Sequence, residues 1–172
     1  MTAIYDDADT ITTRSLVTDG LGSGALHREA TDRLFREAHT AYAFTDEPVS
    51  DAELAEIYDL ARYAPTAMNS QPLRITFIRS DEAKARLLPH LAEGNRAKAA
   101  SAPVVAILSA DTDFHETLPR LLPHVPNARD RFADDVAREQ AALFNATLQA
   151  GYVILAIRAA GLAKGVPTAA LS

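Results

Sequence analysis

The feature that most constrains the fold is a short, continuous apolar run, Val104-Val105-Ala106-Ile107-Leu108. Such a run is typical of a β-strand that is covered on both faces, because a strand with one face in water alternates apolar and polar residues. Residues 74–79 are rich in β-branched and aromatic side chains and predict a second strand. The two segments together predict a sheet flanked by helices.

Two helices are predicted before the first strand. Apolar residues that recur every four positions line one face of the first helix: Leu26, Ala30, Leu34 and Ala38. Ser50 and Glu53 form a capping box, in which each side chain accepts the backbone N–H of the other residue, so a second helix begins there. Its apolar face follows at helical spacing, and Pro65 ends it: Leu54, Ile57, Tyr58 and Ala61.

Later helices are predicted after each strand. Ser80 and Asp81 can cap a helix that follows the first strand. The longest helical stretch runs from about residue 135 to residue 160, and Gly161 is its expected C-cap. Its large apolar residues fall on one side, which is typical of a helix that faces a core: Val136, Leu143, Phe144, Leu148, Tyr152 and Leu155.

Composition and charge narrow the function. Residues 1–24 lack an apolar period and end in a glycine-rich stretch, so we expect a flexible arm before one domain over residues 25–172. A net charge of -6 gives no general basic surface, which argues against nucleic-acid and membrane partners. The chain has no cysteine for a disulfide, a thiolate zinc site or a nucleophile. We find no leader and no run of about 20 apolar residues, so we expect a cytoplasmic protein.

Three segments carry candidate site residues, and each also has an ordinary structural explanation. The connection from Ala64 to Arg74 (APTAMNSQPLR) can be a polar turn whose amides satisfy backbone groups. Lys98, in Gly94-Asn95-Arg96-Ala97-Lys98 before Ala102-Pro103, can be a solvated surface lysine. Asn145, inside the long helix, can bond a neighbouring carbonyl.

Taken together and in this order, the three segments resemble the nitroreductase family of FMN-dependent oxidoreductases, over most of the chain from about Leu34 onward. The resemblance implies an α+β fold in which a central sheet packs among helices. It also implies a homodimer with FMN at the subunit interface and NAD(P)H as co-substrate. No side chain need act as a nucleophile, because the cofactor carries the chemistry.

The resemblance also implies a role for each matched residue. The loop residues that would contact the flavin of the partner subunit are Pro65, Thr66, Ala67, Asn69 and Gln71. Asn95 and Lys98 would reach the pyrimidine end of the ring, where a cation stabilises the negative charge of the reduced flavin. Lys98 is therefore the main candidate for a catalytic residue. Asn145 would lie near the flavin on the long helix.

The sequence departs from the family at both ends of the domain. Residues 37–44 stand where the family has an arginine-rich phosphate segment, and here His39 and Thr40 offer hydrogen bonds without a fixed bidentate charge. After Gly161 and Leu162 the family continues through a flavin-facing loop, another helix and a last strand. Residues 163–172 do not match this pattern, so we expect the domain to be incomplete at its C-terminus.

Leu73 replaces a family tryptophan, and residues 114–119 and 121–124 resemble the malonic semialdehyde reductases of pyrimidine degradation. That branch implies reduction of a small aldehyde, malonic semialdehyde, to 3-hydroxypropionate, with Arg74 guiding the substrate carboxylate; a nitro or quinone acceptor remains open. The alternative is a truncated, non-catalytic module for dimerisation or interaction. No metal is expected, since His115 and Glu116 lack a further ligand at helical spacing.

Overall fold

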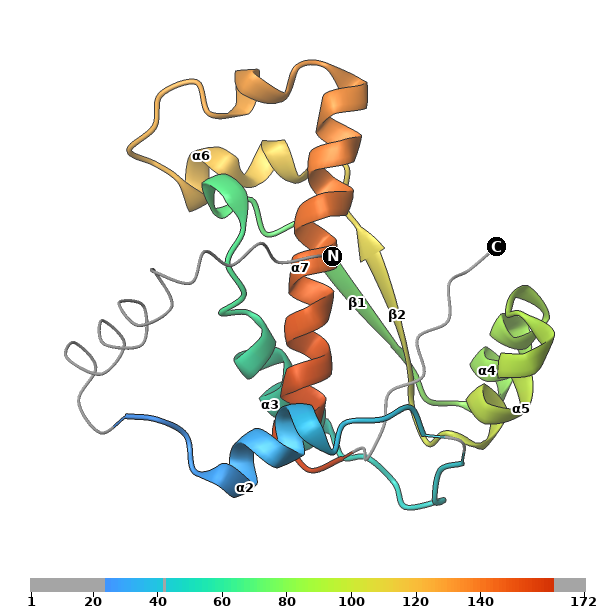
Figure 1. The fold of residues 1–172 in the computed structure, drawn as a ribbon. Coiled ribbons are helices and arrows are strands. Elements are labelled where there is room, and N and C mark those ends of the chain that lie inside the picture. Colours follow the sequence, from blue (N-terminus) through green and yellow to red (C-terminus); the bar gives the residue numbers. More distant parts are fainter. Residues whose placement is uncertain (1–23, 42, 163–172) are drawn as a thin grey trace, which may run out of the picture.

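Two antiparallel strands form the sheet in the computed structural model, which describes residues 24–41 and 43–162. β1 spans Leu73–Ile78 and β2 spans Val105–Ala110, so Leu73 pairs with Ala110 at one end and Ile78 with Val105 at the other. The strands run beside the longest helix, α7 (Figure 1). Apart from Gly24, the predicted arm lies outside the described residues, as does the segment after Leu162.

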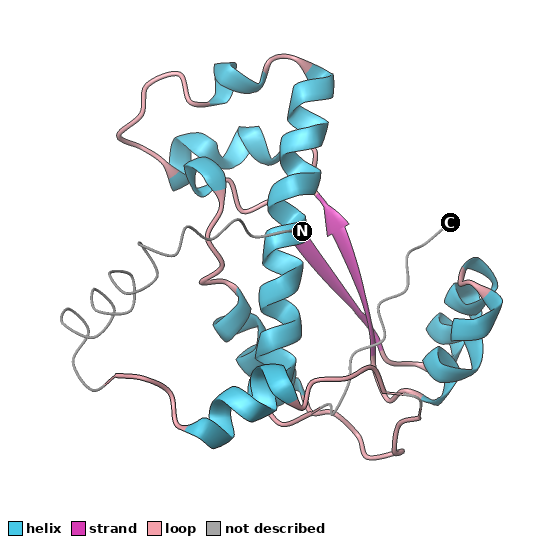
Figure 2. Ribbon diagram, in the orientation of Figure 1, coloured by secondary structure: helices cyan, strands magenta, loops and turns pink. Residues whose placement is uncertain are grey.

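Helices make up most of the remaining structure (Figure 2). The α-helices are α2 (Arg28–Thr31), α3 (Asp51–Ala61), α4 (Asp81–Leu87), α5 (Glu93–Ser101), α6 (Leu118–Leu121) and α7 (Asp135–Ala159). A π-helical turn, Asp32–Arg36, extends α2, and four 3-10 turns connect other elements: Ala67–Asn69, Leu88–His90, Phe114–Thr117 and Arg129–Phe132. The α+β class predicted from the sequence is confirmed.

The capping box of α3 is present as predicted. The Ser50 Oγ accepts the Glu53 N–H at 3.2 Å, and the Glu53 Oε2 accepts the Ser50 N–H at 2.7 Å. The Ser50 Oγ also donates to the Glu53 Oε2 at 2.7 Å, and this bond together with the one from the Ser50 backbone lowers the pKa of the Glu53 carboxyl. Only Ile57 and Ala61 of the predicted apolar face are buried, while Tyr58 is 57% exposed, so the core-facing stripe of α3 is narrower than expected.

Replacing Ser50 with Ala should destabilise the fold by about 1 kcal/mol, which lowers the Tm by about 2–4 °C in a chain of this size. Because the pKa of Glu53 is lower in the folded than in the unfolded protein, the ionised carboxylate stabilises the fold above the unfolded pKa. This stabilisation is lost as the pH falls through the folded pKa. Thermal melts of both proteins at about pH 7 and about pH 3 should therefore give a smaller difference in acid. A difference that does not change with pH would contradict this.

The core consists of two clusters joined by α7. In the first, Ile57 and Ala61 of α3 pack on Val153 and Ala156 of α7, and side chains of β1 cover them. In the second, Phe114 and Leu118 pack against Ala142 near the start of α7, and Phe132 meets the Phe114 ring edge-on at 4.9 Å. The central helix therefore fixes both the α3 side and the α6 side of the molecule.

The prediction of which side of α7 faces the core is wrong for the described chain. Five of its six large apolar residues are 40–65% exposed, namely Val136, Leu143, Phe144, Leu148 and Tyr152, and the sixth, Leu155, is half-buried. The buried side consists of small residues, two amides and one valine: Ala142, Asn145, Ala146, Gln149, Val153 and Ala156. Small side chains let α3 and the strands approach α7 closely, so these elements pack on the small-residue side. The periodicity of the sequence therefore identified an apolar face of α7, but not which side of the helix the rest of the chain covers.

Two further expectations are corrected by the structure. β2 has no fully buried residue, and Leu108 is 37% exposed, because α7 covers the sheet and no described segment buries the strand completely. The first helix is short and turns π-helical, with Leu26 60% exposed. By length and mean hydropathy alone α7 is apolar enough to cross a membrane, a test that core helices of globular proteins also meet, and here it packs against α3 and both strands.

Candidate functional site

The loop over residues 64–72, between α3 and β1, is attached to α7 by two buried amides. The Asn145 Oδ1 accepts the Ala67 N–H at 2.7 Å, and the Gln149 Oε1 accepts the Leu73 N–H at 2.9 Å. Asn145 is 4% exposed and Gln149 is 5% exposed. Because they are four residues apart, the two amides lie on one face of the helix. The loop is therefore held near both of its ends.

The backbone of this loop is unusual. Met68, Asn69 and Gln71 have φ values of 54°, 50° and 46°, in the left-handed region that residues other than glycine seldom adopt. Such conformations cost about 1–3 kcal/mol each and persist where the surroundings hold them. Thr66 contributes to holding them, since its Oγ1 accepts the Gln71 N–H at 3.2 Å. The loop is thus shaped by its contacts more than by local preference.

Polar groups gather on the exposed side of the loop. Asn69 is exposed and donates from Nδ2 to the Leu121 carbonyl at 3.1 Å, while Gln71 donates from Nε2 to the Asn69 Oδ1 at 3.0 Å. Pro65 and Ala67 are also exposed. Ser70 is 1% exposed, and its hydroxyl has no hydrogen-bond partner among the described residues. The loop offers uncharged donors and acceptors, which suits a neutral heterocycle with a polyol chain.

Arg74 closes the junction between the loop and β1. Its Nη2 lies 2.5 Å from the Asp111 Oδ2, and its Nη1 donates to the carbonyls of Gln71 and Leu73, both at 3.0 Å. The side chain is 47% exposed. Its charge is already balanced by Asp111, so a substrate carboxylate would have to compete with that carboxylate for the guanidinium.

The other predicted residues lie at the opposite end of the sheet. Asn95 and Lys98 are half-buried on α5, which leads into β2 at Val105. Val105 pairs with Ile78, the last residue of β1, whereas the loop joins β1 at its first residue. A six-residue strand is about 17 Å long. Figure 1 shows α5 at one end of the strands and α6, beside the loop, at the other.

His39 and Thr40 belong to the segment between α2 and α3, and both are exposed. The His39 Nδ1 lies 2.9 Å from the Glu37 carbonyl oxygen. Arg79, directly after β1, donates to the Val49 carbonyl at 2.9 Å and pairs with Asp51, which attaches the end of this segment to the α5 end of the sheet. The segment passes below that end in Figure 1.

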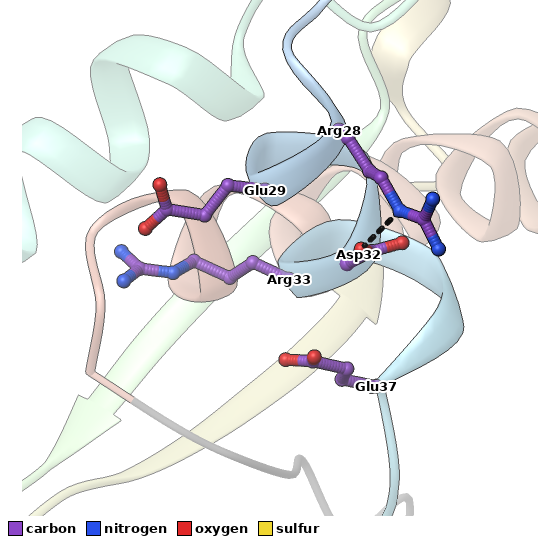
Figure 3. Close-up of a pocket in the computed structure, with 5 residues that line it drawn as sticks. All are labelled: Arg28, Glu29, Asp32, Arg33 and Glu37. Atoms are coloured by element: carbon purple, nitrogen blue, oxygen red, sulfur yellow. Dashed lines mark ion pairs between the residues drawn. The ribbon is translucent and has the colours of Figure 1, made fainter.

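A separate pocket beside α2 is not a phosphate site. Figure 3 shows its five charged side chains, with Arg28 directed at Asp32 and with Glu29 and Arg33 extending to the same side. Asp32 pairs with Arg28 at 3.5 Å and with Arg36 at 2.5 Å. Two arginines stand against three carboxylates in this lining, so the pocket does not favour an anion.

Sequence reasoning found most of these residues but missed Gln149 and Ser70. Gln149 had a signal, because a second amide four residues after Asn145 must share its helix face. Ser70 had none, since its burial depends on the fold of the loop. The structure brings residues 65–71, Arg74 and Asn145 together and leaves Asn95 and Lys98 at the other end of the sheet. His39 and Thr40 lie in the segment whose end Arg79 attaches there.

Comparison with known proteins assigns the family. The profile described as "Nitroreductase family" matches residues 35–168. A Streptomyces coelicolor protein, provisionally named NADH dehydrogenase/NAD(P)H nitroreductase, is 60% identical over 144 residues, or 83% of this chain and 74% of that protein. A Leptothrix cholodnii protein with the same provisional name is 54% identical over 142 residues, or 82% of this chain and 72% of its own length.

Solved structures share the fold at low sequence identity. A nitroreductase-type structure from Exiguobacterium sibiricum, solved in complex with FMN, superposes with a TM-score of 0.66 at 22% identity and covers 80% of this chain and 72% of that one. A Bacillus subtilis structure superposes with a TM-score of 0.67 at 20% identity, over 78% of this chain and 73% of its own. The extent of the profile match and the identity to full-length relatives establish that this chain belongs to the nitroreductase family.

Proposed function

We propose that this chain is an FMN-dependent oxidoreductase that takes reducing equivalents from NAD(P)H and works as a homodimer. The relatives that are 54–60% identical carry names that specify NAD(P)H, and the Exiguobacterium structure contains FMN. The observation that carries the proposal is the separation of the predicted flavin residues into two groups at opposite ends of one sheet. One complete site then needs one group from each of two subunits.

The exposed face of α7 is the surface on which we propose that the second subunit packs. It carries five large apolar side chains, which we call the α7 apolar face: Val136, Leu143, Phe144, Leu148 and Tyr152. A contiguous apolar surface of this kind usually marks an interface. Asn145 and Gln149 hold the loop from the other side of the same helix, so a partner on this face would be connected to the loop through α7.

The residues present fit FMN. When bound, FMN supplies the redox chemistry, accepting a hydride from NAD(P)H and passing it to the acceptor. Thr66, Asn69 and Gln71 supply uncharged hydrogen-bonding groups for the ring and the ribityl chain, with Pro65 and Ala67 as exposed contacts. Asn95 and Lys98 of the partner subunit supply a donor and a cation where negative charge develops. His39 and Thr40 are the proposed phosphate contacts in their segment.

Asn145 acts on this site through the loop. Its Oδ1 holds the Ala67 N–H, and its Nδ2 donates to the Ala141 carbonyl, one turn earlier, at 2.8 Å. The Asn145 side chain is only 4% exposed, so it is buried in its place on α7. We therefore propose that Asn145 fixes the loop beside the flavin.

For the acceptor, we propose a small aldehyde, malonic semialdehyde, which would give 3-hydroxypropionate. The support is the resemblance of residues 114–119 and 121–124 to the reductases of that substrate and the half-exposed Arg74 beside the loop. A nitro or quinone acceptor is the alternative, supported by the nitroreductase names of the relatives. A cytoplasmic location fits the supply of NAD(P)H and a chain without cysteine.

Mixed dimers test the shared site. Asn69→Ala and Lys98→Ala chains, each inactive alone, are mixed at equal amounts and allowed to exchange subunits. Half of the dimers are then mixed, and each has one intact site, so about one quarter of the wild-type activity should return. The measurement is NAD(P)H oxidation per protein chain at saturating FMN. Mixtures no more active than either parent would show that the site lies within one subunit.

A further inference from the structure

Three side-chain amides form a continuous hydrogen-bond chain from β1 to α6, and we call Gln149, Gln71 and Asn69 the amide relay. The Gln149 Oε1 accepts the Leu73 N–H at 2.9 Å, and its Nε2 donates to the Gln71 Oε1 at 2.6 Å. Gln71 donates to the Asn69 Oδ1 at 3.0 Å, and Asn69 donates to the Leu121 carbonyl at 3.1 Å.

The relay has one direction, because a backbone group fixes each end. The N–H of Leu73 can only donate, and the carbonyl of Leu121 can only accept. Each amide must then turn its oxygen toward Leu73 and its NH2 group toward Leu121, since reversing any one would set two oxygens or two donors against each other. The orientations of Gln71 and Asn69 are therefore held from both ends of the relay, by Gln149 on the buried side and by the Leu121 carbonyl on the exposed side.

Burial falls along the relay from the core to the surface. Gln149 is 5% exposed, Gln71 is half-buried and Asn69 is exposed. Each NH2 group has a second hydrogen and each oxygen a second lone pair beyond the relay bonds. At the exposed end these groups remain available to a ligand, while the buried end anchors the relay where water is excluded.

We infer that Gln149 is a positioning residue. It does not touch the flavin itself, but through Gln71 it helps to set the orientation in which Gln71 and Asn69 meet the flavin. This inference rests on the proposed FMN site. Asn69 and Gln71 also have left-handed backbones, with φ values of 50° and 46°, so the relay holds both the side chains and the strained loop that carries them. Loss of Gln149 would leave both amides held from the Leu121 end alone, so Gln71 would lose one of its two relay bonds.

Gln149→Glu separates this role from simple support of β1. A glutamate keeps nearly the same volume and keeps an oxygen for the Leu73 N–H. Its ionised carboxylate has no donor for the Gln71 Oε1, so Gln71 and then Asn69 would have to reverse, which opposes the Leu121 carbonyl. When protonated, the glutamate regains one O–H donor and can restore the relay.

The test is FMN affinity, measured by quenching of FMN fluorescence at about pH 8 and about pH 5.5, since burial at position 149 raises the pKa of an introduced carboxyl above its usual range. We expect Gln149→Glu to bind FMN about tenfold more weakly at the higher pH and to approach wild-type affinity at the lower pH. Gln149→Met, which has no amide, should be weak at both. The exposed Asn127→Asp is the control for an amide-to-acid change, and wild type corrects for titration near the loop, where Arg74 and Asp111 are paired.

Hydrogen exchange of the Ala67 and Leu73 amides in the FMN-free protein supplies a second measurement. Exchange at Leu73 should be faster in Gln149→Met, which removes the acceptor of its N–H. Exchange there should be unchanged in Gln71→Met, which removes only the middle link of the relay. Gln71→Met should still weaken FMN binding. Variants that bind FMN as tightly as wild type at both pH values overturn the inference and leave the proposed function standing. A folded wild type that binds no FMN overturns the proposed function itself.

Discussion

Replacing Leu148 with Asp is expected to convert the proposed homodimer into a monomer and to abolish FMN binding. Leu148 is 43% exposed on the α7 apolar face, beside Phe144 and Tyr152 at four-residue spacing. Burying its side chain at an interface is worth about 1.5–3 kcal/mol, and an unpaired carboxylate in the same place costs several kcal/mol more. The dimer dissociation constant should therefore rise by on the order of 1000-fold or more.

Light scattering at micromolar protein gives the mass, and fluorescence titration gives the FMN affinity of the same samples. Leu26→Asp is the matched control, since Leu26 is 60% exposed and lies outside α7. This control should remain dimeric and bind FMN. A Leu148→Asp protein that stays dimeric would mean that another surface joins the subunits, and a monomer that binds FMN as tightly as wild type would mean that one chain holds a complete site.

Replacing Lys98 with Ala should slow reduction of the bound flavin by NAD(P)H about 100-fold to 1000-fold while weakening FMN binding much less. Removal of one group that stabilises developing charge typically has an effect of this size, because the interaction is strongest in the transition state. Stopped-flow bleaching of the flavin absorbance measures the rate directly. Lys98→Arg keeps the charge and should retain most of the rate. An equal loss of rate in both variants, or no loss in Lys98→Ala, would contradict the proposed role.

The elements that sequence reasoning predicted well are those fixed by nearby residues. The capping box at Ser50 and Glu53 spans four residues, and α3 begins where it predicts. The strands predicted over residues 74–79 and 104–108 are observed as Leu73–Ile78 and Val105–Ala110, and Gly161 takes the positive φ of 78° expected for a helix C-cap. Local hydrogen bonding and backbone preference decide all of these.

Sequence reasoning failed where distant segments decide the outcome. The burial of α7 depends on which side receives α3 and the strands, and an apolar side next to a small-residue side does not reveal this. In the site, Asn145 and Gln149 bond to residues that come 76 to 78 positions earlier in the chain. These contacts exist only after the helix has packed on the sheet. The matched motif predicted the site residues, while their division between the two ends of the sheet required the strand register.

The most direct test of the proposed function is to pass the protein, equilibrated with excess FMN, through gel filtration and then to mix it anaerobically with NADH or NADPH. We expect the dimer peak to carry the absorbance bands of oxidised flavin, one of the two nucleotides to bleach them within seconds, and an added aldehyde, nitro compound or quinone to restore them. A folded protein that elutes without flavin, or whose bound flavin neither nucleotide bleaches, would contradict the proposed function and identify this chain as a non-catalytic member of its family.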